Sequence, residues 1–272
     1  MKKFICLLLV IMVLSSGCSS LHKDVSDIIT QTLINTAGQE KAEKKESHTL
    51  AATDKKAFNI ISSVGDISIA SHQSDDTIIN INMRSSAGTR EKAEEIIENY
   101  TYTIKEENNT IEVDTSFEKP LSGVNLSVDL EIYIPSTIND VKISTNVGDI
   151  HLSGINGNID VKSSVSEALI DKSEGSYNLQ VDVGDIRLVD CLAIGNSNFQ
   201  TSTGNMEFSL DITKSDSITA ETGVGDIEMA IKADKGYHAV INEFMEDERV
   251  EKKGDPNTQI SLKTGVGKIS FK

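Results

Sequence analysis

The tetrapeptide Val-Gly-Asp-Ile occurs four times in the 272-residue chain, and this repetition constrains the fold more than any other feature. The copies are Val64–Ile67, Val147–Ile150, Val183–Ile186 and Val224–Ile227. Two variants, Thr203–Met206 and Val266–Ile269, keep the glycine and the apolar fourth residue but carry Asn205 and Lys268 in place of the aspartate. Internal repeats with a short period indicate a fold that stacks one small unit many times.

The distances between the motif glycines give the length of this unit. These glycines are Gly65, Gly148, Gly184, Gly204, Gly225 and Gly267. The step of 36 between the second and third makes two units of 18 if Val165–Ala168 is a degenerate copy, and the next two steps are 20 and 21. We interpret the last step of 42 as two units of 21, with one copy lost in a looser segment between Glu243 and Asp255.

A unit of about 20 residues containing two strands suits one coil of a β-solenoid, because each coil stacks on the last through parallel ladders. In this interpretation the motif is a corner: glycine permits the turn, Asp or Asn bonds its own local backbone, and both flanking apolar residues point inward. The segments 141–144 and 159–162 alternate apolar and polar residues on one side of the corner, and 150–152 and 186–188 on the other. The sequence therefore predicts an all-β fold, a single-stranded β-solenoid or β-roll with coils of 18–21 residues.

The first half of the chain is less regular and predicts longer strands at 77–83, 100–105, 110–114 and 125–134. Between them, residues 89–99 predict one short helix, because Ala93, Ile96, Ile97 and Tyr100 recur at helical spacing. We expect this helix to cover the first coil, since an open solenoid end exposes unpaired strand groups.

The N-terminus has the features of an export signal over residues 1–17. Lys2 and Lys3 precede an apolar run, Phe4–Leu14, and a small-residue exit, Ser15–Gly17, leads to Cys18. This ending resembles the bacterial lipobox, with Ser15 where leucine is usual, and the resemblance implies lipidation of Cys18 and cleavage of the signal. The alternative is an ordinary secretory signal that leaves a free thiol near the new N-terminus.

The rest of the chain divides into two parts. Residues 18–56 are predicted to be a flexible tether, because the stretch 39–46 is charged enough to stay solvated, with a short helix expected at 27–37. The repeat domain is predicted over 57–272. Only Cys191 remains in this domain, so no disulfide framework is expected, and we interpret Cys191 as a small buried hydrophobe rather than a reactive thiol.

Composition excludes several classes of partner. After loss of the signal, 24 basic residues face 42 acidic ones, a net charge of −18, which argues against nucleic acid. Such a surface also repels anionic head groups and cell-wall polymers unless divalent cations intervene, so lipid rather than charge should hold the chain to a membrane. Tryptophan is absent and aromatic residues make up 4% of the chain, which does not suit a carbohydrate site built on stacking.

The residues that carry a family resemblance lie at the start of the regular repeats. An alternating strand, Leu126–Pro135, is followed by Val141–Ile150 and by further Gly-Asp-Ile corners. This arrangement resembles the bacterial family named "putative adhesin", over about Phe58 to Lys272. The resemblance implies a β-solenoid and surface attachment but carries no binding residues to transfer, and Ser166 and Lys268 depart from the repeat pattern.

The candidate site residues are the repeated acids. The column consists of Asp66, Asp149, Asp185 and Asp226, with Asn205 in one copy. Stacked carboxylates could bind calcium, but the Gly-Gly-x-Gly-x-Asp repeat of calcium-binding β-rolls is absent, so we interpret them as turn-capping residues and expect no metal and no cofactor. The five histidines, His22, His48, His72, His151 and His238, show no metal-ligand spacing, and no nucleophile, phosphate-loop or dinucleotide motif occurs.

These features favour a non-catalytic surface binding or adhesion module, lipid-anchored outside the cytoplasm at the cell membrane or outer membrane. The alternative is an envelope lipoprotein that scaffolds, or senses stress, by binding another envelope protein. An enzyme is not expected.

Overall fold

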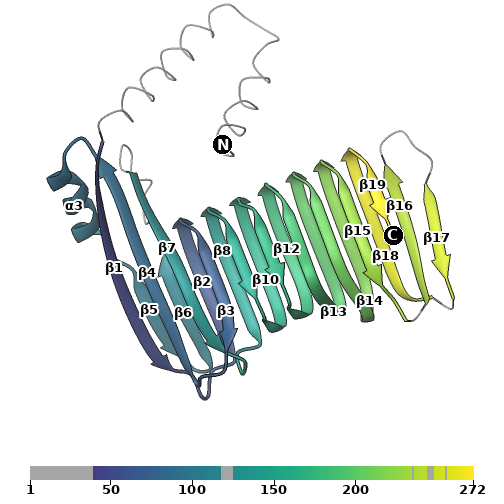
Figure 1. Cartoon of the computed structure of the whole chain (residues 1–272), viewed down its shortest axis with the longest axis horizontal. Coiled ribbons are helices and arrows are strands. Elements are labelled where there is room, and N and C mark those ends of the chain that lie inside the picture. Colours follow the sequence, from purple (N-terminus) through teal and green to yellow (C-terminus); the bar gives the residue numbers. More distant parts are fainter. Residues whose placement is uncertain (1–38, 118–124, 235, 244–247, 255) are drawn as a thin grey trace, which may run out of the picture.

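The computed structural model describes residues 39–117, 125–234, 236–243, 248–254 and 256–272. This part of the chain consists mostly of β-strands in one large mixed sheet, with a single short helix (Figure 1). The predicted signal 1–17, Cys18 and the helix expected at 27–37 lie outside the described residues. None of the helical structure in the described ranges is long and apolar enough to cross a membrane.

Most strands belong to a regular part that we call the repeat stack. Its strands are β2 (Ala57–Val64), β3 (Ile67–His72), β8 (Asp140–Val147), β9 (Ile150–Ser153), β10 (Asn156–Val165), β11 (Ala168–Asp171), β12 (Glu174–Val183), β13 (Ile186–Thr203), β14 (Met206–Val224), β15 (Ile227–Lys232), β18 (Pro256–Val266) and β19 (Ile269–Phe271). Each repeat contributes one strand before the Val-Gly-Asp-Ile corner and one after it, so the two halves of the repeats form two parallel ladders.

The register confirms the predicted period. Ile159 lies opposite Val141 and Tyr177, each 18 residues away. Phe199 lies opposite Leu179 and Ala220, 20 and 21 residues away. The degenerate copy beginning at Val165 pairs with Val147 and Val183, so it is a true member of the series.

The interpretation of the 42-residue step was wrong. Ile260 of β18 pairs directly with Ile218 of β14, 42 residues earlier, so no copy is missing between them. The intervening residues form a C-terminal cap, β16 (Gly236–Glu243) and β17 (Arg249–Lys253), in which β16 pairs in parallel with β18 and β17 pairs antiparallel with β16. The chain therefore extends beyond the last repeat and then returns to complete it.

The opposite end has a larger N-terminal cap, formed by one strand before the first repeat and a long insertion after it. Its elements are β1 (Glu40–Ala51), β4 (Asp76–Ala87), α3 (Arg90–Asn99), β5 (Thr103–Glu107), β6 (Thr110–Thr115) and β7 (Asn125–Pro135). β6 and β7 stack in parallel on β2 and β3, whereas β4 pairs antiparallel with β7 and β1 with β4. The four strands predicted for this half are confirmed as β4 to β7.

The predicted helix is confirmed as α3. Thr89 is its N-cap, and the Thr89 side chain accepts a hydrogen bond from the backbone N–H of Lys92. Ala93 and Ile97 are buried, as the helical spacing indicated. The helix packs on β1 and β4 at the far end of the cap (Figure 1), so it covers the cap sheet rather than a repeat.

The tether prediction was wrong for residues 40–51, which form β1. In this strand Ala42 is the one buried side chain among many charged ones, so no hydrophobic pattern marked it. Its stability comes from the backbone, because β1 pairs with all twelve residues of β4 and satisfies an otherwise open edge. β1 is then itself the edge strand of the sheet, and its charged side chains disfavour pairing with another chain.

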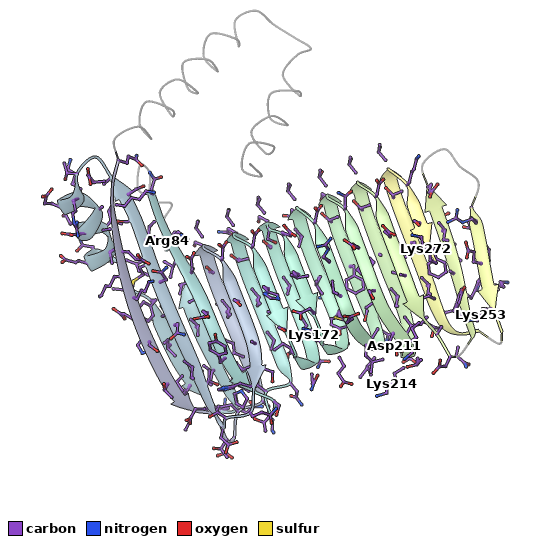
Figure 2. All side chains as sticks on the ribbon, viewed as in Figure 1. Arg84, Lys172, Asp211, Lys214, Lys253 and Lys272 are labelled. Atoms are coloured by element: carbon purple, nitrogen blue, oxygen red, sulfur yellow. The ribbon has the colours of Figure 1, made fainter. Side chains whose placement is uncertain are left out.

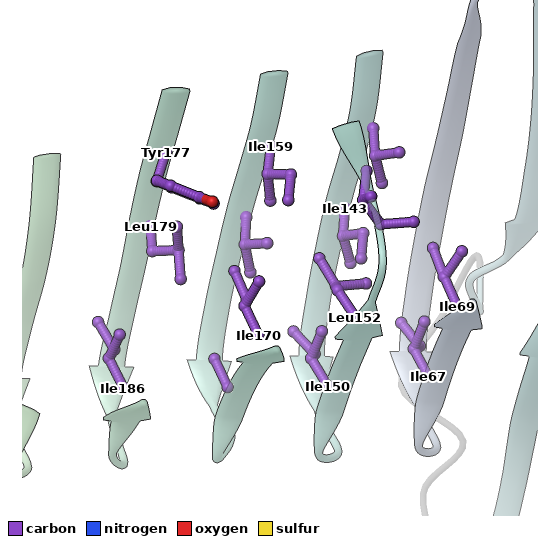
Figure 3. Close-up of a cluster of buried hydrophobic side chains, with 14 of the residues drawn as sticks. Ile67, Ile69, Ile143, Ile150, Leu152, Ile159, Ile170, Tyr177, Leu179 and Ile186 are labelled. Carbon is purple, nitrogen blue, oxygen red and sulfur yellow. The ribbon is translucent and has the colours of Figure 1, made fainter. Parts of the chain in front are cut away.

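The core lies between the two ladders of the stack. Ile143, Ile159 and Leu179 point inward from the strands before the corner, toward Ile150 and Ile170 from the strands after it (Figure 3). All five are at most 1% exposed. Burial of each such side chain contributes about 1.5–3 kcal/mol, so stability rises repeat by repeat.

Candidate binding surface

The motif glycines stack at one corner, where a Cβ on a glycine would meet the backbone of the neighbouring repeat. Gly184 and Gly204 have φ values of +134° and +157°, which favour glycine. A Cβ on Gly204 would also lie 2.0 Å from the carbonyl oxygen of Gly184, and one on Gly225 would lie 1.9 Å from that of Gly204. The prediction that Gly148, Gly184 and Gly225 occupy equivalent corners is therefore confirmed, and so is that of the column formed by Gly65, Gly148, Gly184, Gly204, Gly225 and Gly267.

The repeated acids form a second column, and their role differs from the predicted one. The Oδ1 atom of Asp149 accepts a hydrogen bond from the backbone N–H of Glu167 at 3.0 Å, in the next repeat rather than its own. The same bond joins successive repeats at Asp66 to Asp149, Asp185 to Asn205, Asn205 to Asp226 and Asp226 to Lys268. The side chain thus links successive repeats, and Lys268 joins the series through its backbone N–H, which donates to Asp226.

One member of this column was missed in the sequence. Asp129 accepts a hydrogen bond from the backbone N–H of Asp66 at 3.2 Å and forms an ion pair with Arg84. It lies in Ser127–Leu130, a copy in which Val128 replaces the glycine. This copy keeps only the aspartate of the motif and the apolar residue after it, and these two were the signal that could have identified it.

The valines of the motif do not point inward, which corrects the prediction that Val147, Val183 and Val224 are buried. Only the residue after the aspartate enters the core, as Ile150, Ile186 and Ile227 do. The residue two positions before the valine fills the corner instead. These inward residues are Ser62, Thr145, Ser163, Val181, Thr201, Thr222 and Thr264.

In the last three repeats this inward residue bonds the glycine column. The hydroxyl of Thr222 donates to the carbonyl of Gly204 at 2.9 Å, and that of Thr264 to the carbonyl of Gly225 at 2.8 Å. The fold does not require this bond in every repeat, because Val181 occupies the position in one of them. Two consecutive outward residues then follow, so that the motif valine faces solvent.

The outward valines pair with one another along the stack. The ladder runs through Val64, Val147, Val165, Val183, Thr203, Val224 and Val266. Exposure ranges from 43% for Val147 to 57% for Val266, and Val64 is half-buried. We call Val147, Val165, Val183, Thr203, Val224 and Val266 the valine row. With neighbouring strands about 4.8 Å apart, its six members span about 24 Å.

The opposite corner of the repeats carries charge instead. Lys172, Asp211 and Lys214 extend outward along one edge of the stack (Figure 2). Lys232 lies 2.7 Å from Asp211. Burial opposes ionisation of Asp211, but hydrogen bonds from Lys232 and Thr213 outweigh it and lower the pKa of Asp211 to about 2.

A groove of about 740 Å³ lies where the N-terminal cap meets the stack. It is open to solvent, and its floor includes Asn80, Ser68 and His151. The lining carries one base, Lys45, and the acids Glu46, Asp66, Asp129, Glu131, Asp149 and Glu167. The groove adjoins the first members of the acid column, so both features belong to one acidic surface.

Three of the histidines and Cys191 make contacts that give them a structural role. His151 lies 2.8 Å from Asp171 and is half-exposed, His48 bonds the hydroxyl of Tyr102, and His72 bonds the backbone carbonyl of Asp76. Cys191 is 2% exposed, which confirms it as a small buried residue, and burial raises the pKa of its thiol. Within the described ranges, no group of three or more His, Cys, Asp or Glu side chains could hold a metal ion.

Comparison with known proteins gives matches among solved structures alone. Neither a protein-family model nor a curated protein matches the sequence. A structure described as a putative adhesin from Bacteroides fragilis is 18% identical, with a TM-score of 0.49, and the match covers 84% of this chain and 97% of that one.

Two further matches have different descriptions. A putative cell adhesion protein from Clostridium sporogenes is 13% identical, with a TM-score of 0.34, over 85% of this chain and 99% of that one. A putative lipid binding protein from Parabacteroides distasonis is 12% identical, with a TM-score of 0.34, over 84% of this chain and 97% of that one. At these values the similarity is too distant to identify a ligand.

Proposed function

We propose that this chain is an extracytoplasmic lipoprotein, anchored through Cys18, whose repeats form a β-solenoid that acts as a non-catalytic surface binding or adhesion module. The observation that carries the proposal is the valine row and acid column, which repeat one pair of exposed side-chain types along the stack. A surface of this kind suits an elongated partner better than a small substrate. The open groove at the cap is consistent with binding at a surface.

The anchor is tested by replacing Cys18 with serine in a bacterial host that processes lipoproteins. We expect the Cys18→Ser chain to leave the membrane fraction and to lose labelling by an acyl donor, because a removed thiol cannot be acylated. Retention of the variant in the membrane fraction would contradict the proposed anchor.

The binding role is tested by mild crosslinking on cells, followed by capture of the full chain. A cell-wall polymer or host-surface ligand would support adhesion. Capture of a membrane sensor or transporter would favour the scaffolding or stress-sensing lipoprotein instead. Conversion of a bound small molecule by the purified chain would contradict both.

A further inference from the structure

The valine row is an apolar strip that the fold itself does not require. Single exposed apolar residues are ordinary, but a contiguous strip on the order of a few hundred Å² is as large as the biggest apolar patch of a typical monomer, and such patches are often functional. The outward positions opposite one another earlier in the same strands are polar, at Lys142, Asp160 and Asn178. Thr203, at one position of the row, shows that a β-branched polar residue fits there.

Both flanks of the row are acidic or neutral along nearly their whole length. Two residues after each valine lies the exposed column, Asp66, Asp149, Glu167, Asp185, Asn205, Asp226 and Lys268, in which only the last is a base. One residue before each member of the row lie Asn146, Ser164, Asp182, Ser202, Gly223 and Gly265, which contribute one further carboxylate. An apolar strip bordered by carboxylates complements a partner that is both apolar and cationic.

Two other occupants fit these observations less well. A second copy would bring two acid columns together, and a strip of a few hundred Å² is below the roughly 800 Å² per partner of a standard interface. An anionic lipid surface would meet the same carboxylates, which would repel its head groups.

We propose that the valine row and the adjacent acid column together bind a cationic amphipathic peptide segment of a partner protein. The apolar side chains of that segment cover the valines, and its lysines or arginines face the carboxylates. This inference rests on the proposed binding function and names the partner chemistry for it.

The repeats themselves supply variants that keep the fold. Thr203 occupies a valine position, so the set Val147→Thr, Val165→Thr, Val183→Thr and Val224→Thr removes apolar surface in a conformation already present. Asn205 makes the same bond to the next repeat as aspartate, so the set Asp66→Asn, Asp149→Asn, Asp185→Asn and Asp226→Asn removes charge and keeps the hydrogen bonds. A matched control removes four carboxylates elsewhere through Asp140→Asn, Asp160→Asn, Asp190→Asn and Asp216→Asn.

The probe is a fluorescent, helix-forming peptide of about 18 residues containing lysine and leucine, titrated into the full chain carrying Cys18→Ser so that no acyl group competes. We expect saturable binding, at least about tenfold weaker in the threonine set and in the asparagine set, and nearly unchanged in the control set. Binding by the asparagine set should also depend less on salt, because fewer charges are screened.

Several outcomes would overturn the inference. These are no saturable binding, an equal loss in the control set, or binding that the threonine set leaves unchanged. Dimerisation, or attachment to phosphatidylcholine vesicles, that the threonine set abolishes would assign the row to a second copy or to lipid instead. If the peptide fails to bind while Cys18 still controls membrane retention, this inference fails and the proposed anchored module stands.

Discussion

The repeat stack and the N-terminal cap are both β-structure, but different residues maintain them. In the stack, paired strands carry the same residue type at the same register position, and at the motif glycines a Cβ would meet the backbone of the neighbouring repeat. In the cap, β1, β4 and β7 pair antiparallel without a shared motif, and α3 packs on β1 and β4. The comparison indicates that backbone geometry limits substitution in the stack, whereas side-chain burial and edge pairing limit it in the cap.

The largest effect should separate the two apolar positions of one stack motif. Ile186→Asp places an unpaired charge in the core and should destabilise the fold by at least about 4 kcal/mol. Val183→Asp, three residues earlier, should change stability by less than about 1 kcal/mol because Val183 is exposed. Urea denaturation of both variants gives the comparison, and equal losses would contradict it.

A methyl group on the glycine column should have the next largest effect. Gly225→Ala should cost about 3 kcal/mol, because the new Cβ meets the Gly204 carbonyl and the residue has φ of +151°. Gly88→Ala in the cap is the control, since nothing lies within 4 Å of its Cβ position. Both values come from thermal or chemical unfolding, and similar stabilities for the two variants would remove the proposed difference between stack and cap.

This difference also explains what the sequence could predict. The period, the degenerate copy at Val165 and the corner glycines were predictable because the same local geometry recurs in each repeat. The outward valine was not, because alternation breaks at the corner, where Asn146 and Val147 both face solvent. β1 was missed because it has one buried side chain, Ala42, and is held largely by its backbone pairing with β4.

The candidate surface was predictable only in part. The acid column was visible in the sequence, but its hydrogen bonds to the next repeat depend on stacking, which places residues 18 or more positions apart in contact. Asp129 belongs to the column through a contact 63 residues away in the chain, with Val128 where the motif has glycine. A signal for the outward valine did exist two positions earlier, where a buried serine or threonine stands in every repeat except the one with Val181, and its hydroxyl bonds the glycine column in the last three repeats.

The cap helix should give a smaller and local effect. Ile97→Ala removes a buried side chain between α3 and the cap sheet and should cost about 2 kcal/mol. Hydrogen exchange should accelerate in α3, β1 and β4, while amides of β10 and β12 keep their protection, because the two regions are held independently. Faster exchange throughout β10 and β12 would mean that the cap controls the stability of the stack.

The smallest effect should come from the acid column. Asp185→Ala loses the hydrogen bond to the Asn205 backbone N–H and should cost about 1 kcal/mol, whereas Asp185→Asn should cost almost nothing. Thermal melts of both variants measure the difference. A large loss in the asparagine variant would show that the charge itself, and not the bond, matters for folding.

Calcium provides the control for this interpretation. If the column links repeats through hydrogen bonds, millimolar calcium added to the chelator-treated chain should leave its melting temperature nearly unchanged, because a ligand that does not bind the native state cannot stabilise it. A rise of many degrees that depends on calcium concentration would make Asp149, Asp185 and Asp226 candidate ligands.

The central claim is that the first residue of the Val-Gly-Asp-Ile motif faces solvent while the fourth is buried. Thiol labelling tests this claim most directly. Cysteine is introduced at one position at a time, as Val224→Cys or Ile227→Cys, in the full chain carrying Cys6→Ser and Cys18→Ser, with buried Cys191 as the internal reference. The Val224→Cys thiol should react at the rate of a free thiol, and the Ile227→Cys thiol at least about 100-fold more slowly, because it reacts only when the fold opens. Equal protection of both thiols would place the valines inside and contradict the account.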